Sequence, residues 1–170
     1  VMPVKCFYYD SGEEIGETDD IANAIRYAAD NGADIINMSF GATGNSTLME
    51  NACSYAYNKG VFLVAASGNN GTQNILYPAA YSTVMSVGAT DANDQRASFS
   101  NYGDSLDITA PGVGIYTTYP GGSYNNPSGT SFAAPFTAGC ASLAVSYWKK
   151  NNVDWTPEAV EDIIIYGTRD

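Results

Sequence analysis

The sequence predicts an α/β fold, in which helices flank a mostly parallel β-sheet. Short apolar runs typical of buried strands alternate with amphipathic segments typical of helices, and this alternation favours parallel strands joined by right-handed crossovers. The chain of 170 residues is long enough to bury a sizeable core as one domain. An apolar fraction of 45% and 17 glycines fit a compact, turn-rich fold, whereas a charged fraction of 15% is too low for a disordered chain.

The first predicted elements are a strand, a helix and a second strand. The first strand covers residues 1–7. Thr18 is the expected cap of a helix over residues 19–31, whose apolar residues recur on one face, and Gly32 is placed to end it. The second strand follows at residues 34–38. A chain that opens inside a strand leaves a sheet edge uncovered, where another strand can pair.

The middle of the chain predicts a second helix and a series of strands. Ser46 or Asn45 caps the helix, which extends to Tyr57 and is ended by Gly60. The remaining elements are strands over 61–66, 83–87, 106–110 and 115–119, a hairpin turn at Gly121-Gly122 into residues 123–124, and a last helix with Thr156 as its cap and Pro157 at its first position. Ligand sites in such sheets lie beyond the carboxyl ends of strands, and a Gly-Asn turn follows residues 61–66.

A serine on a tight turn at the start of a helix is predicted by residues 126–135, which read Asn-Pro-Ser-Gly-Thr-Ser-Phe-Ala-Ala-Pro. Gly129 lets the backbone turn sharply, and Thr130 and Ser131 then lie where the first helical N–H groups have no partner. Those N–H groups and the helix dipole favour a developing negative charge. Pro135 is expected within the opening turn, where a missing N–H matters little, and the helix runs to about residue 150.

The sequence contains no histidine, the base that such a serine usually needs. Taken alone, the Gly-Thr-Ser triplet would indicate an ordinary helix start with a serine cap. It closes an ordered series of short motifs, namely Ile36–Gly41, Ala66–Asn69, Tyr77–Tyr81, Ser86–Ala89, Arg96–Gly103 and Ile108–Gly112. In this order, along nearly all of its length, the chain resembles the subtilisin-like serine proteases (subtilases). A series in the right order is far more specific than any one motif.

The resemblance implies roles for particular residues. Ser131 matches the nucleophile, and Asn69 matches the side chain that donates a hydrogen bond to the oxyanion. Without the serine motif, Asn69 would be interpreted as a plain turn residue. The backbone of two segments would flank the substrate side chain that precedes the scissile bond. These segments are Ser39, Phe40 and Gly41, and Ala65, Ala66, Ser67 and Gly68.

The chain also departs from the family. The family's catalytic Asp and His both precede the segment that matches Val1, so neither position is present. We therefore expect residues 1–170 to be a partial subtilisin-like catalytic domain whose N-terminal part is missing, and the missing portion of the same protease to be a partner. Asp10-Ser11-Gly12 spells the family's Asp signature but is interpreted as a plain turn.

The family resemblance implies a polypeptide substrate, and the net charge bears on the other classes of partner. The net charge of −11 and the pI of about 4.1 argue against nucleic acid, which requires clustered Lys and Arg. No apolar run is long enough to span a bilayer, and no membrane partner is expected. Family resemblance implies an extracellular or secreted protein, although no signal peptide is recognisable in the sequence.

The acidic residues and the cysteines offer alternative sites. Acidic side chains gather near the start of the chain, at Asp10, Glu13, Glu14, Glu17, Asp19 and Asp20. The resemblance makes a structural calcium ion an option, but no loop has convincing ligand spacing, and the proposed chemistry requires no cofactor. The cysteines are Cys6, Cys53 and Cys140. Their odd number argues against a complete disulfide framework, and Cys53 and Cys140 are expected to be buried small hydrophobic residues.

Three function classes follow from these observations. The first is a serine endopeptidase, represented by the part of its catalytic domain that bears the nucleophile. A second is a peptide-binding pseudoprotease that keeps the groove without the chemistry, which the presence of both Ser131 and Asn69 disfavours. The third is a sedolisin-like serine-carboxyl peptidase, which pairs serine with Glu and Asp and resembles the subtilases with an Asp at the position of Asn69.

Overall fold

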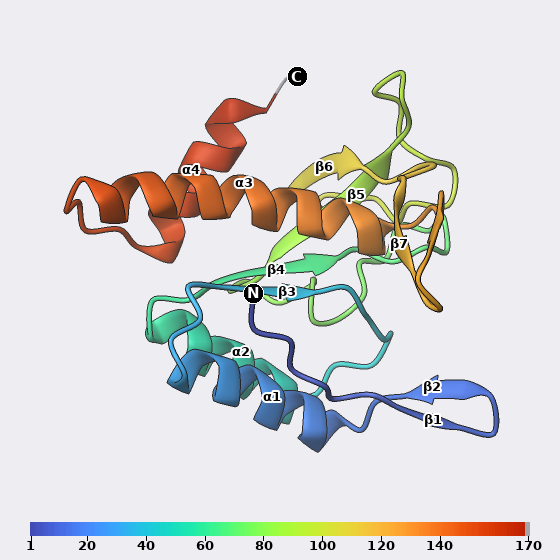
Figure 1. The fold of residues 1–170 in the computed structure, drawn as a ribbon, viewed down its shortest axis with the longest axis horizontal. Coiled ribbons are helices and arrows are strands. Elements are labelled where there is room, and N and C mark those ends of the chain that lie inside the picture. The colour runs from blue at the N-terminus through green and yellow to red at the C-terminus, as the bar shows by residue number, and fades with distance from the viewer. Residues whose placement is uncertain (169–170) are drawn as a thin grey trace.

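Helices cover both faces of a four-stranded parallel β-sheet in the computed structural model, which describes residues 1–168 except for the side chains of Glu13 and Glu14 (Figure 1). These two side chains, part of the predicted acidic group, lie outside the described residues. The strands lie in the order β3 (Ile35–Met38), β4 (Phe62–Ala66), β5 (Met85–Thr90) and β6 (Ile108–Pro111), with every neighbouring pair parallel. The predicted fold class is therefore confirmed.

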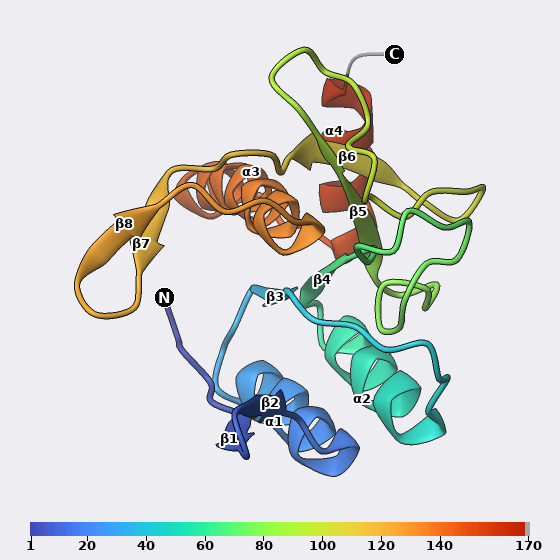
Figure 2. The ribbon, with the colours of Figure 1, turned by 90° about the vertical axis from the view of Figure 1, so that its right-hand side faces the viewer.

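The central strand β4 separates two hydrophobic cores, because successive side chains of a strand point to opposite faces. All five of its residues are buried. Leu63 and Ala65 pack with the helices α1 (Thr18–Asp30) and α2 (Thr47–Asn58), whereas alternate residues from Phe62 pack with α3 (Thr130–Lys150) and α4 (Pro157–Gly167). Figure 2 shows the two pairs of helices on opposite sides of the strands.

Most helix ends lie where the sequence predicts them. The Ser46 hydroxyl accepts a hydrogen bond from the Met49 N–H at 3.4 Å, and Gly32 and Gly60 follow the helix ends with φ angles of +83° and +85°. The predicted cap at Thr18 is wrong, because Glu17 is the N-cap and makes no side-chain capping bond. At the last helix, the predicted Thr156 cap and first-turn proline are both confirmed.

The strand expected at residues 1–7 is wrong, since this segment forms no strand. No strand of the described chain lies beside it to share a ladder, and Pro3 has no N–H to donate. Instead, β1 (Tyr8–Asp10) and β2 (Glu13–Ile15) form an antiparallel hairpin. Its turn contains Ser11 and Gly12 at positive φ, so the interpretation of Asp10-Ser11-Gly12 as a plain turn is confirmed.

The second predicted hairpin forms near the start of α3. Strands β7 (Thr117–Tyr119) and β8 (Ser123–Asn125) pair antiparallel, and the Gly121-Gly122 turn has φ angles of +80° and +73°. Such angles suit the tight turns that match the twist of a hairpin. The strand expected at residues 83–87 begins later, as β5, because residues 81–84 form a turn held by the bond from Val84 N–H to Tyr81 O.

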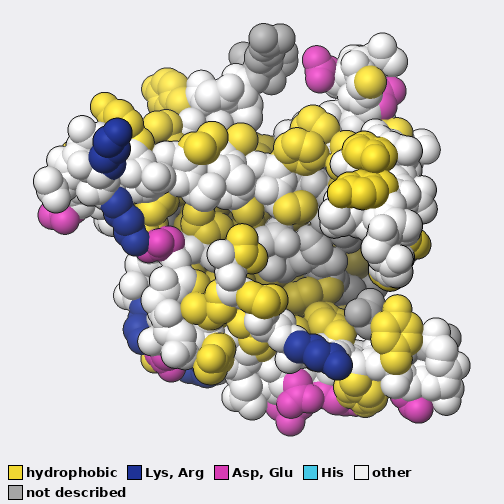
Figure 3. Space-filling model, viewed as in Figure 1, with side chains coloured by type: hydrophobic (Ala, Val, Ile, Leu, Met, Phe, Trp, Pro, Cys, Tyr) yellow, Lys and Arg dark blue, Asp and Glu magenta, His cyan; other side chains and the backbone are white. Residues whose placement is uncertain are grey.

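The sheet has two edge strands, β3 and β6. Among the described strands β3 pairs only with β4, and its other side borders a groove of about 1120 Å³. Residues 1–4 and α1 form one wall of this groove, and α3 forms the other from Pro135 to Lys149. Figure 3 shows hydrophobic side chains gathered between α1 and α3 on this face. The uncovered edge is thus present, but on β3 rather than on residues 1–7.

Of the two cysteines predicted to be buried, one is buried and the other is exposed. Cys53 is buried in the core between α1, α2 and the sheet, as predicted, and burial raises the pKa of its thiol to about 12. Cys140 is exposed, so the prediction that it is buried is wrong. Thr137 and Ala141, its neighbours on α3, are buried, so Cys140 lies at the exposed margin of the helix face that meets the sheet. No helix within residues 1–168 is both long and apolar enough to cross a membrane.

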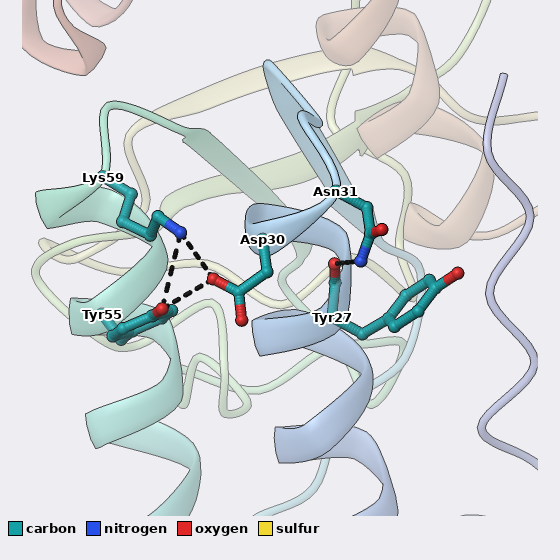
Figure 4. A network of polar contacts seen from close by, with 5 residues as sticks. All are labelled: Tyr27, Asp30, Asn31, Tyr55 and Lys59. Atoms are coloured by element: carbon teal, nitrogen blue, oxygen red, sulfur yellow. Dashed lines mark hydrogen bonds and ion pairs between the residues drawn. The ribbon is translucent and has the colours of Figure 1, made fainter.

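A polar cluster joins the ends of α1 and α2 (Figure 4). Tyr55 OH donates to Asp30 Oδ1 at 2.6 Å, and Lys59 Nζ donates to the same oxygen. Arg26 adds a cation–π contact with the Tyr55 ring at 4.8 Å. The hydrogen bonds from Lys59 and Tyr55 lower the pKa of the Asp30 carboxyl below its ordinary value. All these groups are at the surface, where such a cluster contributes only modest stability.

Asp30→Asn should lower Tm slightly at neutral pH, by about 1–3 °C, and the difference should vanish in acid. Because the folded-state pKa is lowered, the carboxylate stabilises the fold above its ordinary pKa of about 3.9 and loses this effect as pH falls through the folded value. Thermal unfolding from pH 7 to pH 2 measures both the decrease in Tm at neutral pH and its disappearance in acid. The control is Asp104→Asn, an exposed aspartate without an ion pair in the described chain. A difference that persists at pH 2 would contradict the role of the charge.

Candidate active site

Ser131 is the second residue of α3 and is half-buried. The N-cap Gly129 has extended backbone, with φ 160° and ψ 158°, and supplies no capping side chain. Its N–H donates to Gly112 O at 2.8 Å, and its carbonyl accepts from Phe132 N–H at 3.1 Å. The Ser131 N–H has no hydrogen-bond partner among the described residues. The prediction of unpartnered N–H groups at the helix start thus holds for Ser131, whereas it is wrong for Thr130, whose N–H donates to Asn69 Oδ1.

Ser39, directly after β3, and Ser131 hold each other through reciprocal hydrogen bonds. The Ser131 hydroxyl donates to Ser39 O at 3.1 Å, and the Ser39 hydroxyl donates to Ser131 O at 2.8 Å. Asn37 Nδ2 also donates to the Ser39 hydroxyl at 2.9 Å. The start of α3 is thus tied to the end of the edge strand. The Ser131 hydroxyl donates to a carbonyl, which is not a base that could activate it.

Pro135 explains why the Ser131 carbonyl is free to accept the bond from Ser39. In a regular helix this carbonyl would accept from the N–H four residues later, but proline has no N–H. The structure places Pro135 inside α3 rather than in its opening turn, so that part of the prediction is wrong. The effect of Pro135 is to release a carbonyl that the end of β3 then binds.

Asn69 lies just beyond the carboxyl end of β4, where the topology favours a ligand site. Its Oδ1 accepts two hydrogen bonds from Thr130, one from the backbone N–H at 2.8 Å and one from the hydroxyl at 2.9 Å. The Thr130 hydroxyl accepts in turn from Gly68 N–H at 3.2 Å. Because Asn69 Oδ1 accepts both bonds from Thr130, the orientation of the exposed Asn69 amide is fixed. Its Nδ2 makes no hydrogen bond to any described residue.

The arrangement places a hydroxyl and two unpartnered donors at the start of α3. The donors are the Ser131 N–H and Asn69 Nδ2, and the helix dipole adds a partial positive charge. Such a set can stabilise an oxygen that becomes negatively charged when a hydroxyl attacks a carbonyl. Thr130, which sequence reasoning assigned only a free N–H, is the residue that orients the Asn69 amide.

The two predicted substrate-flanking segments differ in exposure. Ser39 and Phe40 are half-buried and Gly41 is exposed, whereas residues 65–68 are buried. The Ser67 N–H already donates to Val87 O within the sheet region. Among the described residues, no group of three or more His, Cys, Asp or Glu side chains could hold a metal ion.

Comparisons with known proteins show the family and the fold. The sequence model of the Subtilase family matches residues 1–169. The chain is 51% identical over 136 residues to the thermophilic serine proteinase of Bacillus sp. (strain AK1), covering 80% of this chain and 34% of that protein. It is 46% identical over 141 residues to subtilisin Savinase of Lederbergia lenta, covering 83% and 51%. The chain thus spans between a third and about half of these relatives.

Solved structures show the same fold. A mutant of the protease domain of PatA has a TM-score of 0.86 at 34% identity, covering 91% of this chain and 59% of that chain. The prenylagaramide maturation protease PagA has a TM-score of 0.83 at 35% identity, covering 91% and 58%. The four-stranded parallel sheet and its helices therefore match the fold of subtilisin-like protease domains. The chain belongs to the Subtilase family.

Gly68→Ala should destabilise the fold by at least about 2 kcal/mol. Gly68 has a φ of +111°, and a Cβ there would overlap Asn101 Nδ2 and lie 2.7 Å from Leu76 Cγ. Urea unfolding measures the effect. Gly44→Ala is the matched control, because a Cβ at Gly44 has no atom within 4 Å. Equal free energies of unfolding for the two variants would mean that the turn before Asn69 is not closely packed.

Proposed function

We propose that this chain supplies the nucleophile and the oxyanion donors of a subtilisin-like serine endopeptidase, which hydrolyses peptide bonds through an acyl-enzyme on Ser131. One observation carries the proposal. Thr130, the neighbour of Ser131, holds Oδ1 of Asn69 through two hydrogen bonds, so that Nδ2 remains available beside the free N–H of Ser131. Family membership and the relatives' names as proteases support the same activity.

In the proposed reaction, Ser131 Oγ attacks the scissile carbonyl carbon and forms a C–O bond. The oxyanion is stabilised by Asn69 Nδ2 and by the Ser131 N–H. The Ser131 proton passes to a base and then to the leaving amine as the C–N bond breaks. Water hydrolyses the resulting ester and regenerates the hydroxyl. Before attack, the hydroxyl must leave its hydrogen bond with Ser39 O.

The base is proposed to come from outside the 170 residues, because the sequence contains no histidine. The missing N-terminal portion of the same protease, bearing the catalytic Asp and His, is the proposed partner. The free edge of β3 and the adjoining groove support this docking. A strand added to β3 would satisfy unpaired backbone groups and cover apolar side chains. Because Ser39 follows β3 and bonds Ser131, that strand would end near the nucleophile.

The proposed substrate is a polypeptide, bound in extended form along Ser39, Phe40 and Gly41, with residues 65–68 behind them. Backbone pairing of this kind gives affinity with little sequence preference. The proposed hydrolysis needs no cofactor, and a calcium ion would serve only structure. The strongly acidic composition favours neither nucleic acid nor an anionic membrane surface as a partner. Family membership supports a secreted enzyme.

The two alternative functions are less well supported. A pseudoprotease has no need for an amide as firmly oriented as that of Asn69. A sedolisin-like peptidase would have an acidic side chain at the oxyanion position, where this chain has Asn69. Its acidic catalytic partners would also have to come from elsewhere, because neither Ser131 nor Asn69 forms a hydrogen bond with a carboxylate of the described residues.

The isolated chain should react very slowly with a fluorophosphonate probe, and adding the upstream segment with its Asp and His should make labelling of Ser131 rapid. A serine without a base is a weak nucleophile at neutral pH, and the partner brings an imidazole within roughly 2.6–3.2 Å. Mass spectrometry of the labelled peptide and peptide hydrolysis both measure the gain. Ser131→Ala should abolish it, whereas Ser128→Ala should retain labelling. Binding of the two segments without labelling of Ser131 would reject the proposed nucleophile.

In the reconstituted enzyme, Asn69→Ala should lower kcat by about 10²–10³ with KM nearly unchanged, because the amide acts mainly in the transition state. Asn70→Ala is the matched control, an adjacent exposed asparagine whose side chain makes no hydrogen bond to the described residues. Steady-state kinetics on a peptide substrate separate the two parameters. An effect confined to KM would assign Asn69 to the groove rather than to the oxyanion.

A further inference from the structure

Asn101 lies completely buried beneath the turn that carries Asn69. Its Nδ2 donates to Ser67 O at 3.1 Å and to Asn74 O at 2.7 Å. Its Oδ1 accepts from Asn70 N–H at 2.9 Å and from Thr72 N–H at 3.3 Å. One side chain thus bonds four backbone groups of a single turn; of these, Ser67 O also accepts from Leu76 N–H at 3.0 Å, whereas Asn74 O and the Asn70 and Thr72 N–H groups have no other partner among the described residues.

Backbone hydrogen bonds from the same segment reinforce this contact. Asn101 N–H donates to Gly68 O at 3.0 Å, and Tyr102 N–H donates to Thr72 O at 3.1 Å. Gly71 N–H donates to Phe99 O at 2.7 Å. Backbone groups of Phe99, Asn101 and Tyr102 therefore hold the turn over residues 67–74 through hydrogen bonds. The absence of a side chain at Gly68 is what permits the close approach of Asn101.

Asn69 itself is held only through its amide oxygen. It is exposed, and both of its side-chain bonds go to Thr130 at the start of α3. The position of its backbone depends on the shape of the turn, and that shape depends on the four bonds of Asn101. Loss of a buried partner leaves unsatisfied carbonyl and N–H groups, which relax by moving the turn.

We propose that Asn101 is a positioning residue, which fixes the position of the Asn69 amide through its hydrogen bonds to the turn over residues 67–74. This inference rests on the proposed oxyanion role of Asn69. Asparagine suits the role because its carboxamide donates on one side and accepts on the other. The turn requires both, since two of its groups are carbonyls and two are N–H groups. A displacement of about 1 Å in a catalytic group can lower a rate by as much as ~10²-fold.

The kinetic test uses the active, reconstituted enzyme. Asn101→Ala should lower kcat by about 10- to 100-fold with KM changed less than about twofold, since the misplaced donor acts in the transition state. Ser100→Ala is the matched control. Ser100 is also fully buried and hydrogen-bonded, to Ala89 N–H and Asn101 O, but its side chain makes no bond to the turn. It should lower Tm while leaving kcat within about twofold of the parent.

A double-mutant cycle separates positioning from stability. In the Asn69→Ala background, Asn101→Ala should lower kcat by less than about twofold, because no donor remains to be misplaced. Independent, multiplicative losses would overturn the inference while leaving the role of Asn69 intact. If Asn69→Ala alone leaves kcat unchanged, the proposed oxyanion role fails and the inference about Asn101 fails with it.

Hydrogen exchange provides a readout that needs no activity. In the 170-residue chain, Asn101→Ala should accelerate exchange of the Asn70 and Thr72 amides at least about tenfold relative to Ser100→Ala, because only the first variant removes their acceptor. Asn101→Asp keeps the acceptor and the shape but loses the donors, and serves if the alanine variant does not fold. Asn101→Asp should also lower kcat, and this loss should likewise shrink in the Asn69→Ala background. Unchanged protection in Asn101→Ala, or full kcat in Asn101→Asp, would overturn the proposal.

Discussion

Two hydrogen bonds from Thr130 to Asn69 Oδ1 join the start of α3 to the turn after β4, and the candidate site depends on this junction. Thr130 is fully buried and Asn69 is exposed, so the two bonds tie a surface amide to the interior of the molecule. The junction can form because small residues of α3, such as Ala133 and Ala134, let the helix lie close against the sheet. A helix start, a strand end and an amide are thereby brought together from distant parts of the sequence.

Much of the fold was predictable because it depends on local patterns. The apolar run ending at Ala66, the cap at Ser46 and the glycines after the helices all act within a few residues, and the structure places them as expected. That Asn69 would lie at the start of the helix that carries Ser131 was predictable only through the order of family motifs. The Gly-Thr-Ser triplet by itself is no more than a helix start.

The remaining features depend on tertiary contacts that no local pattern reports. Residues 1–7 have the composition of a strand but no neighbour with which to pair. Cys140 belongs to a helix with small residues on several sides, so the sequence did not reveal which face meets the sheet. The contacts of Asn101 are made with a turn 27–34 residues earlier in the chain.

The open edge of β3 also has a consequence for colloidal behaviour. An unpaired edge beside an apolar groove is a surface on which two copies can associate, strand against strand. The net charge of −11 opposes this, because copies of the chain repel one another at long range. Dissolved salt shortens that repulsion to about 10 Å at 0.1 M ionic strength. Dilute buffers of low ionic strength, well above the pI of about 4.1, are therefore the conditions that keep the chain dispersed.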